Sequence, residues 1–134
     1  IVSNKVTLSG YAVLTPLQSW RFANFGDINA SDTADPDGDG MANLMEYALG
    51  TLPNSAASMV APVLAPIADR LTLSFTRVRG DVTYIVEAGS DLATWTSLAT
   101  NPGTVGQNVT VTDTVPISTA NPSRRFLRLR VTNP

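Results

Sequence analysis

The stretch DPDGDGMANLME at 35–46 places oxygen-bearing groups at the alternate positions that a loop needs to wrap one hard cation. The candidate metal ligands, at positions 1, 3, 5, 7, 9 and 12, are Asp35, Asp37, Asp39, Met41 through its backbone carbonyl, Asn43 directly or through water, and Glu46 with two oxygens. Gly40 at position 6 allows the sharp turn with positive φ. Hard carboxylates select calcium or magnesium over softer metals, and a sevenfold site favours calcium. The pattern therefore predicts a Ca²⁺ site.

An acidic surface turn that binds nothing is the alternative reading of this loop. Four of the 11 acidic residues lie within it, although the formal net charge of the whole chain is only −2. Three aspartates crowded together without a cation would repel one another, which favours the metal. Because only one such loop exists, we expect a structural, extracellular type of site rather than a paired sensor.

Cysteine and histidine are absent from the 134 residues. Their absence excludes disulfides, zinc clusters, cysteine nucleophiles and serine–histidine pairs. Glu87 and Asp91 are the neighbouring acids available to a glycosidase, and they lie on opposite sides of a turn with nothing in the sequence to shift their pKa values. We therefore expect no enzyme activity.

Two further partner classes are not expected. No apolar run approaches the roughly 18 residues of a membrane span. No basic cluster is accompanied by a nucleic-acid motif, which makes nucleic acid an unexpected partner. A basic edge near the C-terminus indicates a solvated strand face, with a surface for an acidic polymer or a neighbouring subunit as the alternative: Arg124, Arg125, Arg128 and Arg130.

The first half of the chain predicts a helix–calcium loop–helix unit over 15–52. One helix is expected over 15–25, with Thr15 as N-cap, and a second over 43–49. Proline and small residues over 53–69 predict a semi-rigid connector.

The fold class is predicted to be mainly β, with a small antiparallel β-sandwich over 70–134 following the helical unit. Apolar residues alternate with polar ones in about five segments, which include 71–77, 82–88 and 126–131. Gly80-Asp81 matches a two-residue hairpin turn between the first two of these segments.

The calcium loop resembles those of dockerins and thrombospondin type 3 repeats. Residues of about 15–134 are similar to C-terminal modules of large secreted proteins of environmental bacteria. The resemblance rests on the order of five segments: SWRFANF, DPDGDGMANLMEYALGTLP, LTLSFTR, YIVEAGSDLATW and RRFLRLRV. That resemblance implies a secreted or cell-surface, non-catalytic structural module. It does not imply a substrate. Since the chain begins at Ile1, we expect a fragment of a longer precursor.

Residues 1–14 lie outside this resemblance and alternate like a strand with no local partner. They would pair within the chain or be donated to a neighbouring copy, which would build an extracellular filament by strand addition. The partners expected are therefore copies of this chain or a parent multidomain secreted protein.

Two other functions are possible in principle. The hypothesis of carbohydrate binding through Trp95 and Tyr84 has less support, because aromatic residues in strands usually belong to the core. The adhesion tripeptide at 79–81 is more simply a turn.

Overall fold

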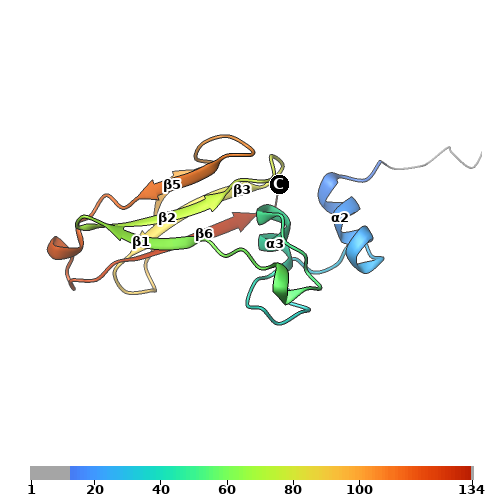
Figure 1. Ribbon diagram of the computed structural model, residues 1–134, viewed down its shortest axis with the longest axis horizontal. Helices are drawn as coiled ribbons and strands as arrows, with labels where there is room; N and C mark the ends of the chain where they lie inside the picture. The colour runs from blue at the N-terminus through green and yellow to red at the C-terminus, as the bar shows by residue number, and fades with distance from the viewer. Residues whose placement is uncertain (1–12, 134) are drawn as a thin grey trace, which may run out of the picture. The chain divides into compact units, whose positions relative to one another are not determined.

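The computed structural model describes residues 13–133 and divides the chain into two compact units, Ile1–Ala30 and Ser31–Pro134 (Figure 1). The acidic loop at 35–46 belongs to the second of these units. The strand predicted over 1–14 lies outside the described residues, apart from its last two positions.

The first unit contains the helix α2 (Pro16–Phe25), as predicted. The Thr15 hydroxyl accepts a hydrogen bond from the Gln18 backbone N–H, and the Gln18 side chain accepts one from the Thr15 N–H. This capping box satisfies donors that the first turn leaves without helical partners. Gly26 ends the helix with a φ of 69°.

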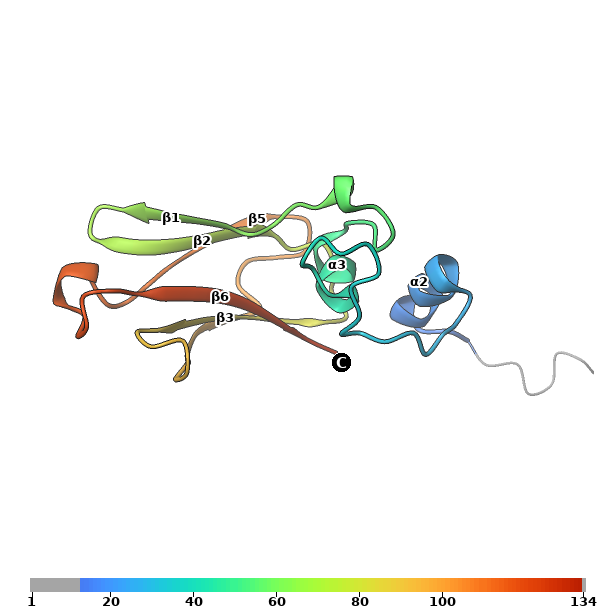
Figure 2. The same ribbon diagram turned by 90° about the horizontal axis from the view of Figure 1, so that it is seen from below.

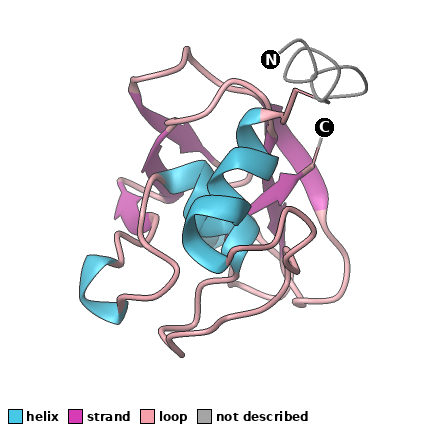
Figure 3. Ribbon diagram, turned by 90° about the vertical axis from the view of Figure 1, so that its right-hand side faces the viewer, coloured by secondary structure: helices cyan, strands magenta, loops and turns pink. Residues whose placement is uncertain are grey.

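The second unit contains one short α-helix, two single turns of 3₁₀ helix and six strands. These elements are α3 (Asn43–Leu49), η1 (Ala56–Ser58), β1 (Val63–Ile67), β2 (Arg70–Thr76), β3 (Thr83–Gly89), β4 (Thr96–Thr100), β5 (Asn108–Thr112), η2 (Ile117–Thr119) and β6 (Phe126–Thr132). Loops and turns of different lengths join them (Figure 3). None of the helices among residues 13–133 is long and apolar enough to cross a membrane.

The strands form two antiparallel three-stranded sheets, in the orders β1-β2-β5 and β4-β3-β6 (Figure 2). The predicted hairpin at Gly80-Asp81 is therefore wrong, because β2 and β3 belong to different sheets. Both edges of β2 are already occupied by β1 and β5. The link between β2 and β3 does reverse the chain, but the chain passes from one sheet to the other at this point instead of forming a hairpin.

The segment 53–69, expected to be a connector, contributes the edge strand β1. Pro66 in this segment argued against a strand at the level of sequence, because proline has no backbone N–H to donate to a neighbouring strand. An edge strand tolerates the missing donor. β1 pairs with β2 in register from Val63 opposite Ser74 to Ile67 opposite Arg70.

The core of the second unit is built from the apolar residues predicted on the strands together with α3. Phe75 of β2 and Tyr84 of β3 stack with ring centroids 5.7 Å apart. The most deeply buried apolar residues are Tyr47, Ala48, Leu73, Phe75, Val82, Tyr84, Val86, Ala88 and Leu127. α3 therefore packs as part of the same core as the strands.

Candidate metal centre

The acidic loop is closed by hydrogen bonds between its two ends. The Asn43 backbone N–H donates to the Ala34 carbonyl at 2.9 Å, and the Leu44 N–H donates to the Asp32 carbonyl at 3.0 Å. The Asn43 side-chain amide donates to the Ser31 carbonyl at 2.7 Å. Position 9 of the loop is thus held beside position 1.

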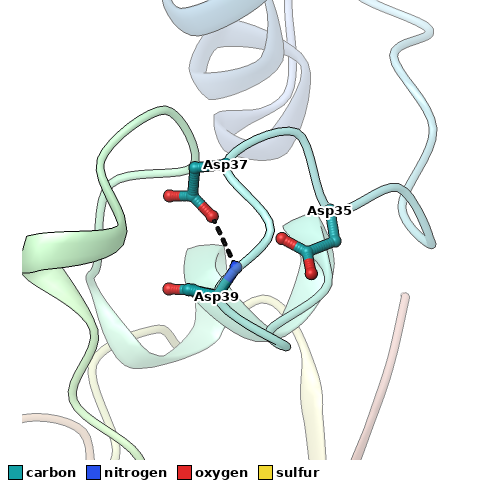
Figure 4. A group of neighbouring side chains, drawn as sticks. All are labelled: Asp35, Asp37 and Asp39. Carbon is teal, nitrogen blue, oxygen red and sulfur yellow. Dashed lines mark hydrogen bonds between the residues drawn. The ribbon is translucent and has the colours of Figure 1, made fainter.

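Asp35, Asp37 and Asp39 converge inside this loop, with one carboxylate oxygen of each within 4.8 Å of the others (Figure 4). The backbone holds them there. The two Asp35 oxygens accept the Gly38 and Gly40 N–H groups, both at 2.9 Å. The remaining lone pairs of the Asp35 carboxylate are free to bind a cation.

Asp37 and Asp39 are oriented in a similar way. One oxygen of Asp37 accepts the Asp39 N–H at 3.2 Å, which Figure 4 draws as a dashed line, and one oxygen of Asp39 accepts the Met41 N–H at 2.8 Å. The second oxygen of each carboxylate, Oδ2, is buried and has no hydrogen-bond partner.

Unsatisfied buried atoms concentrate at this site. Among the described residues, five buried side-chain polar atoms lack a hydrogen-bond partner, and four of them belong to predicted ligands: Asp37 Oδ2, Asp39 Oδ2, Asn43 Oδ1 and Glu46 Oε2. Burying such oxygens without a partner is costly. All four are acceptors, which is the donor set that a hard cation requires.

Glu46 is fully buried at the start of α3. Burial raises the pKa of its carboxyl to about 7, and the negative charges of Asp37 and Asp39 add to this rise. The hydrogen bond that the Thr51 hydroxyl donates to Glu46 at 3.2 Å acts in the opposite direction and lowers the pKa. The Glu46 carboxyl is therefore close enough to the aspartates to interact with their negative charge. A divalent cation among these carboxylates would offset the repulsion.

The two remaining loop positions have distinct roles. Gly40 adopts a φ of 92°, as its place in the pattern predicts. The Met41 side chain is buried, and its sulfur accepts a hydrogen bond from Thr51 at 3.7 Å. The role of the Met41 carbonyl as a ligand stays a prediction.

A hydrogen-bonded clasp follows Glu46 on α3, and sequence reasoning missed it. The Tyr47 hydroxyl donates to both oxygens of Asp81, and the Arg79 guanidinium lies 4.4 Å from the centroid of the Tyr47 ring. The Arg79 Nε also donates to the Tyr47 carbonyl at 3.1 Å. The clasp holds α3 to the link between β2 and β3.

A second contact continues the clasp into the core. The buried Tyr84 hydroxyl donates to the Ala48 carbonyl at 2.6 Å and accepts the Arg79 N–H at 2.9 Å. Arg79 and Asp81 are thus engaged within the molecule, which argues against the adhesion reading. These partners are 32 to 36 residues apart in sequence, so no local pattern could have revealed them.

The aromatic residues considered for sugar binding are largely covered. Tyr84 is fully buried beneath Phe75. Trp95 is half-buried, and the Arg128 guanidinium lies 4.1 Å from its ring centroid. A sugar ring would need a free aromatic face, which the buried Tyr84 does not offer, and Arg128 occupies one face of Trp95.

Glu87 has a lowered pKa. Burial alone would raise it, but hydrogen bonds from Arg128 at 2.7 Å and Arg130 at 3.0 Å outweigh that effect. Backbone N–H groups of Thr94 and Ala93 lower the pKa of Asp91. The expectation that nothing shifts these pKa values is therefore wrong, and the direction of both shifts is opposite to what a general acid needs.

The basic edge is not a uniform solvated face. Arg125 donates to both oxygens of the buried Asp113 at 2.6 and 3.1 Å, and Arg124 donates to the Ser90 carbonyl. Since Arg128 and Arg130 share Glu87, these arginines mainly tie strands and loops together. This arrangement weakens the alternative of a docking surface for an acidic polymer.

No protein-family model matches this chain, and neither a curated protein nor a solved structure matches it. The resemblance to dockerin and thrombospondin type 3 calcium loops therefore stays a prediction.

Proposed function

We propose that this chain is a non-catalytic, calcium-stabilised structural module of a secreted or cell-surface bacterial protein. The observation that carries the proposal is the set of four buried, unsatisfied acceptor oxygens on Asp37, Asp39, Asn43 and Glu46. They coincide with positions 3, 5, 9 and 12 of the loop pattern. Burial of Glu46 and Asn43 provides support that an exposed acidic cluster alone would lack.

Calcium suits this ligand set better than other ions do. Carboxylate, amide and carbonyl oxygens favour calcium and magnesium over zinc or copper. Magnesium demands a tight octahedron and retains water, whereas calcium accepts six to eight oxygens in a flexible arrangement. The absence of cysteine and histidine removes the ligands that softer metals prefer.

The proposed role of the ion is to staple the loop onto the sheets. Glu46 is a ligand, and the next residue, Tyr47, is bound to Asp81. We infer that the two sheets face each other as a β-sandwich, since Phe75 and Tyr84 stack between them. Fixing Glu46 would then fix the start of α3 against that sandwich.

An extracellular setting fits this role. Extracellular calcium modules bind with dissociation constants of about 10⁻⁴ to 10⁻³ M. A metal can also replace the disulfides that a cysteine-free secreted domain lacks.

Thermal unfolding with calcium and with chelator tests the proposal. At 100 times the dissociation constant, binding stabilises the folded state by about 2.7 kcal/mol, which raises the midpoint by roughly 10 °C. Asp37→Asn/Asp39→Asn should abolish the increase, whereas Asp91→Asn, an exposed carboxylate outside the loop, should retain it. An unchanged midpoint in the wild-type chain would remove the structural role.

A further inference from the structure

Two neighbouring hollows lie beside β6 in the second unit. One hollow of about 280 Å³ is lined by residues 128–131 of β6 together with the beginning of α3, and another of about 490 Å³ adjoins the loop residues 39–42. The two hollows share Ala42, Met45 and Leu129, and we call them together the β6 groove. Its apolar lining includes Met41, Leu44, Met45, Met59, Leu129 and Val131.

β6 is an open edge of its sheet. Among the described strands it pairs only with β3, and its seven residues contain no proline. An unpaired edge of this kind is a template for another strand. β1, the corresponding edge of the other sheet, is a poorer template because Pro66 lacks a backbone donor.

The core is left incompletely covered on this flank. Leu64 of β1 stands opposite Leu73 of β2, so both side chains point to the same face of the sheet. Leu73 is buried, whereas Leu64 is 51% exposed. In Figures 1 and 2, β1 and β6 lie on the same side of the two sheets. One added strand beside β6 would therefore cover apolar surface from both sheets.

The N-terminal segment has the composition that such a strand requires. Val6, Leu8, Gly10 and Ala12 alternate with polar or larger residues, and Lys5 is the one charged residue among the first 14. Nine extended residues span about 30 Å, which is enough to run along the whole of β6. The element that follows this segment is the helix α2, so no hairpin partner follows it directly in the sequence.

We propose that residues 4–12 of a second copy of this chain add as a strand to the free edge of β6, with Val6 and Leu8 in the β6 groove. The donor segment belongs to the first unit and the acceptor groove to the second. The contact is therefore head-to-tail, and its repetition builds a ring or a linear assembly of many copies. This inference goes beyond the structural role of calcium, because the strand edge and the apolar lining do not depend on the ion.

Disulfide trapping tests the pairing, since the chain has no native cysteine. Full-length Leu8→Cys and Leu129→Cys chains, distinguished by a mass tag, are mixed under mild oxidation in saturating calcium. We expect a heterodimer to form at least tenfold faster than with Thr7→Cys in place of Leu8→Cys, because residue 7 points to the opposite side of a strand. Equal rates for the two positions would overturn the proposal. A double Leu8→Cys/Leu129→Cys chain that closes only on itself would also overturn it.

Sedimentation of the full-length chain provides a second readout that needs no cysteine at β6. The average mass of the wild type should rise with concentration, Leu8→Asp should abolish the rise, and Thr7→Asp should retain it. A wild type that stays monomeric at all concentrations would contradict strand addition. If the unfolding midpoint of this monomeric wild type still rises with calcium, the result contradicts strand addition and leaves the proposed calcium site intact.

Discussion

The Tyr47 hydroxyl donates hydrogen bonds to both carboxylate oxygens of Asp81, at 2.9 and 2.7 Å. Tyr47 directly follows Glu46, the predicted closing ligand of the loop, and Asp81 lies in the link between β2 and β3. One residue of α3 therefore faces the candidate metal centre while the next is anchored to the sheets. This adjacency is what would allow a cation in the loop to stabilise the whole second unit.

Breaking this clasp should destabilise the fold. Tyr47→Phe removes the hydroxyl, and with it the hydrogen bond that the half-buried Asp81 carboxylate accepts through both of its oxygens, at a cost of about 1–3 kcal/mol in the free energy of unfolding. Urea unfolding of Tyr47→Phe, Asp81→Asn and the double variant measures the coupling between the two residues. A coupling near zero would show that the contact does not hold α3 in place.

Glu46→Gln should have opposite effects with and without calcium. The substitution keeps the shape of the side chain but removes a buried carboxylate that has an unsatisfied oxygen. In chelator the variant should be at least as stable as the wild type, because no unpaired charge is buried. In saturating calcium it should be less stable by about 2 kcal/mol, because a charged ligand is lost.

Thermal unfolding in both solutions measures this crossover. Asp91→Asn serves as the control, since it removes an exposed carboxylate outside the loop. The metal-ligand role of Glu46 would be contradicted if Glu46→Gln responded to calcium as fully as the control does.

The buried Asp113–Arg125 pair should govern part of the acid sensitivity. Burial would raise the pKa of Asp113, but its hydrogen bonds with Arg125 and with the Val115 N–H outweigh that effect and lower it. A folded-state pKa below the unfolded value stabilises the fold above about pH 4, and this stability is lost as the pH falls through the folded-state value. The free energy of unfolding should therefore fall with pH below about 4.

Asp113→Asn isolates this contribution. The variant should be less stable by roughly 3 kcal/mol at pH 6, because Arg125 keeps a buried charge without its partner. Its stability should also fall less steeply than that of the wild type between pH 4 and 2. Parallel pH profiles for the two proteins would assign the acid sensitivity to other groups, such as Glu87.

Local features of the structure could be predicted from the sequence. The bounds of α3, the N-cap Thr15 and the positive φ of Gly40 depend on neighbouring residues, and all are confirmed. Five strands and most of their buried faces also follow from period-two alternation. The spacing of the predicted ligands is local as well, so the convergence of Asp35, Asp37 and Asp39 was predictable.

Features set by distant contacts could not be predicted. The Gly80-Asp81 signal specifies a turn but not which strands pair on either side of it. β1 was hidden by Pro66, which only an edge position tolerates. The charge of Arg125 is matched by Asp113, 12 residues away, and no periodic pattern links the two.

The unsatisfied oxygens at the candidate metal centre also combine a feature that the sequence predicts with one that depends on the folded structure. The sequence predicts which residues carry oxygen, but only the folded chain shows that Glu46 and Asn43 are buried with an acceptor atom left unpaired. Burial of these acceptors distinguishes the loop from an ordinary acidic surface turn.

Calorimetric titration of the chelator-treated, full-length chain with calcium tests the central claim most directly. We expect saturable uptake of one calcium ion per chain, abolished in Asp37→Asn/Asp39→Asn and retained in Asp91→Asn. No uptake by the wild-type chain at millimolar calcium, or equal uptake by the loop variant, would contradict the account.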